Sequence, residues 1–580
     1  MKRTSPVMNN TWNSRVNWKL IQTSASPAHI ARLAEDLEIS PALCSILHQR
    51  GMTSLEEMQF FLSPGLRYLQ PLEDWPQLQQ AADLIASSHD SGNRIAVWGD
   101  YDVDGITSAA LLKDFFQSKG IDIRCYLPHR VQDGYGLNMA GMEKLAGEGI
   151  KTLITVDCGI SHHSEISRAR ELGMHVVLTD HHLPGSELPP ANVIVNPQCT
   201  PCPYPGLAGV GSAFFLAAAL NRTLPGPQMD IRNLLDLVAL GTIADLVPLD
   251  RANRILVKNG LLLLSEGRRP GIYALKEASG LGGTDSIGAG QVGFALGPRI
   301  NAAGRLDDPC QALELLLCRD LQQARTIAAR LNTLNNERKK TEETILDMAR
   351  QQANNYKDDS GLILFDPDWH PGVLGIVASR LVEEFYRPCL VLTRENGLIK
   401  GSGRSISGFN LYQGLCSLKS HLTGFGGHSQ AAGLSLEPEN LEELRTGFSR
   451  VISECIGPGP HQKEIVLDAL LGLDELSPDF LQELELLQPF GPENPRPVFL
   501  SPPLKVLDQS LFGKDKHVRF DLKDPESGVK LRGQFWRQGR NLKETSLKGK
   551  NLTLAYTPGI NVYQGLVSIR LNIREILEVS

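Results

Sequence analysis

The stretch RIAVWGDYDVDG, residues 94–105, joins an apolar run to a turn that carries three aspartates. The apolar run predicts a strand, and the turn after it contains Asp100, Asp102 and Asp104. Residues 107–116, TSAALLKDFF, then predict a helix. A strand, an acidic turn and a helix in this order indicate the first unit of an α/β domain.

Further apolar runs alternate with helical stretches over the next hundred residues. They are IDIRCYLP (121–128), KTLITVD (151–157), HVVLTD (175–180) and NVIVNP (192–197). Strands at this spacing, with helices between them, predict βαβ units and a parallel sheet. Because the crossovers between parallel strands are right-handed, the strand C-termini should share one edge of the sheet.

Acidic and histidine side chains occur where these predicted strands end. Asp157 ends one strand, the Asp180–His182 cluster ends the next, and Asp245 follows the apolar stretch 234–244. In a parallel sheet, ligands bind outside the carboxyl ends of the strands. We therefore expect these side chains to meet at one edge, although they are far apart in the chain.

A cluster of this kind favours divalent metal ions. Carboxylates held together repel one another and acquire raised pKa values unless cations neutralise them. A shell of Asp and His without thiolates suits Mn²⁺ or Mg²⁺. Two such ions, about 3.5–4 Å apart, can share a carboxylate, activate water and stabilise an in-line displacement at phosphorus. The sequence therefore predicts a site for two divalent metal ions.

Each of these residues also has a simpler interpretation. The acidic turn could be a helix N-cap, and Asp157 a turn residue. The pair of histidines could be a satisfied surface or core pair, and Asp245 could cap the turn that follows it. Together these interpretations do not explain the pattern, because unrelated helix caps and turn residues would have no reason to follow consecutive strands of one sheet.

The rest of the chain predicts four more parts around this α/β domain. We expect a helical N-terminal cap (1–80), the parallel-sheet domain (81–310), a long connecting helix (311–355), a second α/β domain (356–460) and a C-terminal β-barrel (465–580). Six β-rich segments within about 80 residues favour the barrel. The fold class is therefore α/β with a small β-barrel module.

The composition of the chain limits the classes of protein to which it can belong. The chain has 580 residues, 42% hydrophobic and 21% charged, with no apolar run long enough to cross a membrane and no signal peptide. Ten cysteines spread singly favour reduced thiols in the cytoplasm. Residues 501–550 contain twelve Lys or Arg and six Asp or Glu, so they are about +6 while the remainder of the net −7 chain is about −13. An acidic body with a basic module is typical of an enzyme that holds cations in one part and a polyanion in another.

Nine motifs occur in a fixed order along the chain. They are GDYDVDG (99–105), TVDCGIS (155–161), TDHH (179–182), GTIADLVPL (241–249), RINAAGR (299–305), WHPGVLGIVASRL (369–381), GSGRS (401–405), GFGGHSQAAG (424–433) and QPFGPENPRPVF (488–499). The first four resemble the DHH phosphoesterase superfamily. All nine together resemble its RecJ family of bacterial single-strand-specific exonucleases, over essentially the whole chain.

The resemblance implies roles for the metal cluster. Asp102 and Asp104 would bind different metals, and Asp157 would bridge them. His181 and Asp245 would supply the remaining side-chain ligands.

Three further positions near the cluster follow from the same resemblance. His182 would face the scissile phosphate, where an imidazolium can offset developing charge. Asp100 would act one step removed from the metals or through a water. Some relatives have His where this chain has Trp98, which would leave the protein shell of one metal less complete.

The second α/β domain resembles DHHA1 domains. Arg299, Asn301 and Arg305 are expected in a Gly-containing loop, where the arginines could grip phosphate oxygens or pair with Asp307 or Asp308. The resemblance implies that a set of small residues and donors binds a 5′-terminal phosphate. That set is Ser402, Arg404, Ser405, Gly426, Gly427 and His428. His370 could touch the DNA or could close the turn before Pro371.

The C-terminal module resembles an OB-fold, which holds single strands through basic and aromatic side chains. Candidate DNA-binding residues are Lys514, Lys516, Arg519, Arg532, Phe535, Trp536, Arg537 and Arg540. Side chains alternate along a strand, so one of Phe535 and Trp536 should enter the core and the other face outward. The sequence does not say which.

The resemblance implies a monomeric exonuclease that degrades single-stranded DNA from the 5′ end to mononucleotides in recombination and repair. A helicase and a single-strand-binding protein are expected partners. DHH pyrophosphatases, oligoribonucleotide hydrolases and cyclic-dinucleotide phosphodiesterases are alternatives, but they usually lack the barrel. A non-catalytic replication scaffold is a second alternative, disfavoured because all the acids are present.

Overall fold

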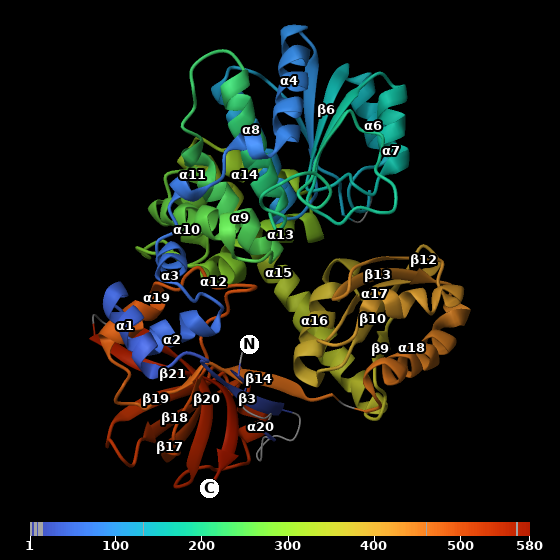
Figure 1. The fold of residues 1–580 in the computed structure, drawn as a ribbon. Helices are drawn as coiled ribbons and strands as arrows, with labels where there is room; N and C mark the ends of the chain where they lie inside the picture. The colour runs from blue at the N-terminus through green and yellow to red at the C-terminus, as the bar shows by residue number, and fades with distance from the viewer. Residues whose placement is uncertain (1–2, 5–7, 10–15, 131–132, 460, 564–565) are drawn as a thin grey trace.

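The structure is a computed structural model that describes residues 3–4, 8–9, 16–130, 133–459, 461–563 and 566–580. Figure 1 shows the parallel-sheet domain at the top, the second α/β domain at the lower right and the barrel at the lower left. No helix within these ranges is long and apolar enough to cross a membrane.

The first sheet is parallel throughout, as the sequence predicts. Its strands are β4 (Arg94–Gly99), β5 (Arg124–Tyr126), β6 (Ile150–Val156), β7 (His175–Thr179) and β8 (Val193–Val195), in the order β5-β4-β6-β7-β8. Because every strand runs the same way, the residues that follow β4, β6 and β7 emerge at one edge.

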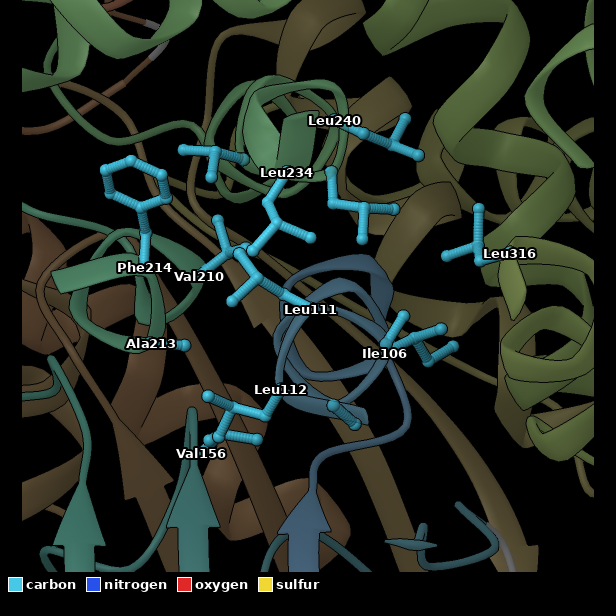
Figure 2. Close-up of a cluster of buried hydrophobic side chains, with 14 of the residues drawn as sticks. Ile106, Leu111, Leu112, Val156, Val210, Ala213, Phe214, Leu234, Leu240 and Leu316 are labelled. Atoms are coloured by element: carbon cyan, nitrogen blue, oxygen red, sulfur yellow. The ribbon is translucent and has the colours of Figure 1, made fainter. Parts of the chain in front are cut away.

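Two hydrophobic clusters cover the two faces of this sheet. Ile95 and Val97 of β4 pack with α4 (Pro76–Asp90), α5 (Val103–Ser118) and α8 (Gly209–Thr223). Ala96 and Trp98 point the other way, into a cluster with α6 (Met139–Gly147) and α7 (His163–Glu171). Figure 2 shows the first cluster, with Leu111 of α5 close to the residues of α8. Because both faces of the sheet are packed against helices, the edge where its strands end is held in a fixed position.

Helix α9 (Leu235–Asp245) is apolar around most of its surface and packs against α5 and against α10 (Arg251–Glu266). It ends at Asp245, and Leu246 takes a left-handed conformation with φ 61°. This termination leaves the Asp245 side chain at the sheet edge rather than inside the helix bundle.

The segment 299–305 is helical, so the expected loop is wrong. It lies in α13 (Gly297–Leu306), which follows a single π-helical turn, η4 (Val292–Leu296). Gly304 suggested a loop, but here it permits close packing, because a Cβ at this position would lie 2.5 Å from the Tyr101 carbonyl oxygen. The helix therefore lies directly against the acidic turn.

The connecting helix is interrupted at 318–320. The short helix α14 (Cys310–Leu317) precedes α15 (Leu321–Ala353), whose 33 residues span about 50 Å. Figure 1 shows α15 running from the first domain toward the second. Its last turns pack into the core of the second domain through Ile345 and Ala349.

The second domain is built on a mixed sheet. Its strands are β9 (Leu362–Phe365), β10 (Cys389–Glu395), β11 (Leu398–Arg404), β12 (Gly424–Gly427) and β13 (Ala431–Leu436), in the order β12-β13-β11-β10-β9. Only the β9–β10 pairing is parallel. The helices α16 (Leu374–Phe385), α17 (Leu411–Cys416) and α18 (Leu441–Ile456) pack on its faces.

The C-terminal module is a closed five-stranded barrel. Its strands are β17 (Leu504–Phe512), β18 (His517–Lys523), β19 (Lys530–Phe535), β20 (Asn551–Tyr563) and β21 (Leu566–Val579). Pairings β17–β18, β18–β19, β19–β21, β21–β20 and β20–β17 complete the circle. The predicted barrel is confirmed.

The N-terminal segment belongs structurally to the barrel. Its helices α1 (Pro27–Leu37), α2 (Pro41–Gln49) and α3 (Leu55–Leu62) share a hydrophobic cluster with the barrel strands. A strand that the sequence did not predict, β3 (Val16–Gln22), pairs in parallel with β14 (Lys463–Leu467). The expected boundary at residue 80 falls within α4, which packs on the first sheet.

Candidate metal centre and phosphate-binding residues

The acidic turn after β4 places two aspartates differently. Asp102 caps α5, and its Oδ1 accepts hydrogen bonds from the backbone N–H groups of Asp104 (2.9 Å) and Gly105 (3.2 Å). Asp104 is buried, and its carboxylate accepts from the N–H groups of Gly209 (2.7 Å) and Val210 (2.9 Å) at the start of α8. Asp102 is therefore a helix N-cap. The Asp104 carboxylate is instead oriented by the backbone N–H groups at the start of α8.

The start of α8 fits against the acids only because residue 209 is glycine. A Cβ on Gly209 would lie 2.8 Å from Asp157 Cβ and 3.0 Å from Asp104 Oδ2. Glycine therefore lets two backbone donors approach the carboxylates closely, which favours their ionised form.

Asp157, His181 and Asp245 converge on Asp104 at the sheet edge. His181 Nε2 lies 3.0 Å from Asp157 Oδ1, 3.6 Å from Asp245 Oδ2 and 3.8 Å from Asp104 Oδ2. Asp157 follows β6 with φ 60°, a left-handed conformation that is strained for a non-glycine residue. The side chains of separate elements thus meet at one point, as the sequence predicts.

The facing atoms of this cluster are unsatisfied. Asp157 Oδ1, His181 Nε2 and Asp245 Oδ2 are buried and have no hydrogen-bond partner among the described residues. Burial and then the neighbouring carboxylates raise the pKa of Asp104 and Asp157 well above the usual range, and burial lowers the pKa of His181. Buried polar atoms normally have a partner, and these three have none. Carboxylate oxygens and imidazole nitrogens are ligands of divalent cations, and a bound cation would also offset the charge that burial disfavours.

Asp180, the first residue of the DHH triplet, positions the histidine pair. Its Oδ1 accepts from the backbone N–H groups of His181 and His182 and from His182 Nδ1 at 2.8 Å, and its Oδ2 accepts from Ile160 N. Burial would raise the pKa of Asp180, but His182 outweighs it and lowers the pKa to about 2. Burial would lower the pKa of His182, but Asp180 raises it to about 9. His182 is therefore an imidazolium near neutral pH.

Asp100 and Trp98 lie behind the cluster. The buried Asp100 accepts a hydrogen bond from Gly136 N at 3.3 Å, and its pKa is raised by burial and by Asp102. The Trp98 indole is stacked on Tyr126 in the core, and its Nε1 donates to the Gly136 carbonyl at 3.2 Å. Both side chains therefore hold the backbone at Gly136.

The three residues of α13 are distributed differently. Asn301 Oδ1 accepts from Val103 N at 3.2 Å, so it supports the first turn of α5. Arg305 donates to the Gly372 carbonyl at 2.9 Å, which links the two α/β domains. Arg299 donates to Asn332 Oδ1 and to the carbonyls of Ala295 and Ala278, so it pairs with neither of the two expected acids.

In the second domain, Ser402 and Arg404 lie over the start of α16. A Cβ at Gly375 would lie 3.0 Å from Arg404 Nη2 and 3.2 Å from Ser402 Oγ. The first turn of α16 receives no side-chain cap. A helix N-terminus beside a guanidinium and a hydroxyl is suited to bind an anion.

The remaining candidates of this domain have structural partners. Ser405 is buried and donates to the Phe409 carbonyl at 2.7 Å. His370 Nδ1 accepts from Gly372 N at 3.1 Å, which is the turn-closing interpretation. Gly426 and Gly427 lie in β12, and Gly427 has φ 138°. His428 is near enough to Arg404 and His182 for their charges, together with burial, to lower its pKa.

Several residues near the cluster were missed by the sequence reasoning. Arg130 lies over the Tyr101 ring at 4.7 Å, and its charge lowers the pKa values of Arg305 and Arg404, which burial depresses first. Tyr135 contacts His182. The sequence could have indicated them, because the residues that follow a parallel strand such as β5 emerge at the same edge as the acids.

On the barrel, the structure resolves the open question about the two aromatic residues. Phe535 is buried in the barrel core, whereas Trp536 is 45% exposed and lies against Phe512 and His517. Lys514 lies in the left-handed β17–β18 turn, Arg519 lies over Phe512, and Arg532 pairs with Asp521.

Three cations of the barrel make ion pairs outside it. Lys516 Nζ lies 2.7 Å from Glu343 Oε1 of α15. Arg537 lies 3.5 Å from Glu383 of α16, and Arg540 lies 3.9 Å from Asp347 of α15. The basic side of the barrel therefore rests on acidic residues of the connecting helix and the second domain.

Comparison with known proteins gives a consistent result. The DHH family N-terminal domain matches residues 94–242, the DHHA1 domain matches 358–454 and the RecJ OB domain matches 467–575. "Single-stranded-DNA-specific exonuclease RecJ" of Salmonella typhimurium is 37% identical over 93% of this chain and 96% of its own. The protein of the same description from Bacillus subtilis is 35% identical over 97% of this chain and 71% of its own.

A solved structure matches nearly the whole chain. RecJ from Thermus thermophilus in complex with Mn²⁺ has a TM-score of 0.84 and 32% identity, covering 98% of this chain and 80% of that one. The same protein with Mg²⁺ has a TM-score of 0.74. From its domains, its sequence and its fold, the chain belongs to the RecJ family of the DHH superfamily.

Proposed function

We propose that this chain is a metal-dependent exonuclease that degrades single-stranded DNA from the 5′ end to mononucleotides, acting in DNA recombination and repair. The observation that carries the proposal is the set of three buried, unpartnered ligand atoms on Asp157, His181 and Asp245. The family relatives described as single-stranded-DNA-specific exonucleases, and those solved with Mn²⁺ or Mg²⁺, support it.

Two divalent ions, Mn²⁺ or Mg²⁺, would be held by five side chains, with Asp157 as the carboxylate that both ions would share. The five are Asp102, Asp104, Asp157, His181 and Asp245. When bound, such ions make water more acidic and balance the charge of a phosphate undergoing displacement. The backbone donors of Gly209 and Val210 keep the Asp104 carboxylate aimed at this point whether or not a cation is present.

The chain's own cations would bind and orient the scissile phosphate. His182, held by Asp180, presents an imidazolium beside the cluster, where it can offset charge on the phosphate oxygens. Arg130 is close enough to Arg305 and Arg404 for its charge to lower their pKa values further, after burial lowers them first. We assign to Arg130 and Arg305 hydrogen bonds to the same phosphate or its neighbour.

Polarity would come from the second domain. A 5′-terminal phosphate bound by Ser402, Arg404 and the first turn of α16 would leave the next phosphodiester for the cluster. Trp536 and the exposed cations of the barrel would hold the strand further along by stacking and charge.

A helicase and a single-strand-binding protein would be partners of a monomeric, cytoplasmic enzyme. Ten unpaired cysteines fit a reducing compartment.

The test is digestion of single-stranded DNA labelled separately at each end, in Mn²⁺ and in EDTA. Mononucleotides should be released first from the 5′ label and only with metal. An Arg404→Ala variant should lose the preference for a 5′-phosphorylated over a 5′-hydroxyl end. Release from the 3′ label first, or equal digestion of duplex and single strands, would overturn the proposal. Faster cleavage of a dinucleotide than of a long strand would instead indicate an oligonucleotide hydrolase.

A further inference from the structure

The segment between β5 and α6 brings a tyrosine to the back of the metal cluster. The Tyr135 hydroxyl donates to the carbonyl oxygen of Asp157 at 3.3 Å. It also lies 3.3 Å from His182 Nδ1 and 3.5 Å from His182 Nε2. One hydroxyl thus touches the backbone of the central carboxylate and the imidazole of the adjacent histidine.

The direction of these contacts is set by chemistry. The phenol has a single proton, and donating it to the Asp157 carbonyl leaves the oxygen lone pairs facing His182. A phenol ordinarily ionises at about pH 10, so Tyr135 keeps its proton near neutral pH.

Asp157 needs this support because of its backbone. Its φ of 60° is left-handed, a conformation that is strained for a non-glycine residue and persists only where its surroundings hold it. Its carbonyl oxygen is held by the Tyr135 hydroxyl, and its carboxylate lies 3.0 Å from His181 Nε2. A change at the hydroxyl can therefore move a carboxylate of the cluster without touching it.

The turn that carries Tyr135 is itself fixed at three points. Trp98 Nε1 donates to the Gly136 carbonyl at 3.2 Å, and Asp100 accepts from Gly136 N at 3.3 Å. The His162 ring lies 3.3 Å from the Tyr135 carbonyl oxygen. Gly136 has φ 75°, and a Cβ there would lie 2.4 Å from His162 Cε1. The buried Trp98 and Asp100 thus hold this turn in place.

We infer that Tyr135 is a positioning residue: its hydroxyl fixes the orientation of His182 and the strained backbone of Asp157 together, and Trp98, Asp100 and His162 hold it in place. The inference rests on the proposed function for its catalytic consequence. Its consequence for cation binding at Asp157 is independent of what the enzyme cleaves.

Tyr135 is 45% exposed, so stacking of its ring on a nucleobase is the competing role. The two roles separate cleanly, because a Tyr135→Phe variant keeps the ring and removes only the hydroxyl. Positioning predicts that this variant loses kcat, whereas stacking predicts that it is neutral and that Tyr135→Leu raises KM.

The experiment measures kcat and KM on 5′-phosphorylated single-stranded DNA, together with Mn²⁺ titration of the metal-free protein by calorimetry. For Tyr135→Phe we expect kcat to fall roughly 10-fold with KM within about twofold, and Mn²⁺ affinity to fall roughly 10-fold. Tyr273→Phe, the same chemical change on an exposed face of α11 (Pro270–Ala278), should change neither quantity.

Gly136→Ala provides a second variant that leaves the hydroxyl intact but pushes the turn away from His162. It should reproduce the kcat and Mn²⁺ changes of Tyr135→Phe with an unaltered melting temperature in EDTA to within a few degrees. Normal kcat and normal Mn²⁺ affinity in Tyr135→Phe would overturn the inference. If the wild-type protein fails to hydrolyse DNA, the proposed function fails, but the Mn²⁺ titration still decides the positioning role.

Discussion

The acidic cluster at the sheet edge and the basic side of the barrel are the two charged regions to which we assign roles toward DNA, and they are built in opposite ways. In the cluster, Asp104 is buried and held by two backbone donors of α8. On the barrel, Lys516 and Arg537 are exposed and rest on acids of α15 and α16. Buried side chains aimed by backbone groups keep one geometry, whereas exposed ion pairs are each worth about 0–1 kcal/mol and exchange partners readily. The first arrangement suits catalysis, which needs a fixed geometry, and the second suits binding of a flexible strand.

The largest effect should come from removing the central carboxylate. Asp157→Ala should lower kcat by roughly 10³-fold or more, because it removes the side chain that both cations would share. Binding of single-stranded DNA, measured by fluorescence anisotropy, should survive, because the barrel is untouched. Asp122→Ala, at an exposed acid paired with Lys113, is the matched control and should be neutral. Near-normal turnover of Asp157→Ala would contradict the assignment of catalysis to the cluster and of strand binding to the barrel.

On the barrel, the exposed aromatic should matter more than any single cation. Trp536→Ala should weaken single-strand binding about 10-fold and raise KM accordingly, with kcat unchanged, because base stacking is worth about 1–3 kcal/mol. Phe535→Ala should instead lower the free energy of unfolding by about 3–5 kcal/mol, because it opens a cavity in the core. If the two substitutions had the same effects on stability and binding, the assignment of their faces would be wrong.

Stability should reveal the charge state of the metal-free cluster. The folded pKa values of Asp104, Asp157 and Asp245 are raised, so the metal-free protein gains stability below the unfolded pKa of about 4 and loses it as pH rises through the folded values. Bound cations offset this loss. The melting temperature in Mn²⁺ minus that in EDTA should therefore be a few degrees larger at pH 8 than at pH 5.5. A difference independent of pH, or one retained in Asp157→Ala, would contradict this.

The smallest effect should come from the ion pairs of the barrel. Glu343→Gln frees Lys516 to bind phosphate, so we expect single-strand affinity to rise by about twofold at low salt and to be unchanged at high salt. Glu337→Gln on the same helix is the control. Weaker binding by Glu343→Gln would mean that the contact shapes the DNA path instead of competing with DNA.

Much of the catalytic domain could be predicted from sequence because local patterns decide it. The apolar runs defined β4, β6 and β7, and parallel topology then brought Asp104, Asp157, His181 and Asp245 to one edge. The failures came from long-range packing. Strand β3 pairs with β14, whose residues are more than 400 positions away, and no local pattern indicates such a partner.

Two details show what a pattern leaves undetermined. Gly304 suggested a loop, because its tight contact with Tyr101 is visible only in three dimensions. Because side chains alternate along a strand, one of Phe535 and Trp536 was predicted to be buried. Which of the two points inward depends on how the barrel closes, through the pairing of β19 with β21. Tyr135 and Arg130 could not be predicted from the pattern of acids and histidines, because the segment after β5 contains no residue of the metal cluster.

Anomalous scattering from crystals grown with Mn²⁺ tests the central claim most directly. We expect two peaks about 3.5–4 Å apart, with Asp157 contacting both and with His181 Nε2 and Asp245 within about 2–2.5 Å of at least one. Peaks elsewhere, or a single peak that leaves Asp157 Oδ1 without a cation, would contradict it.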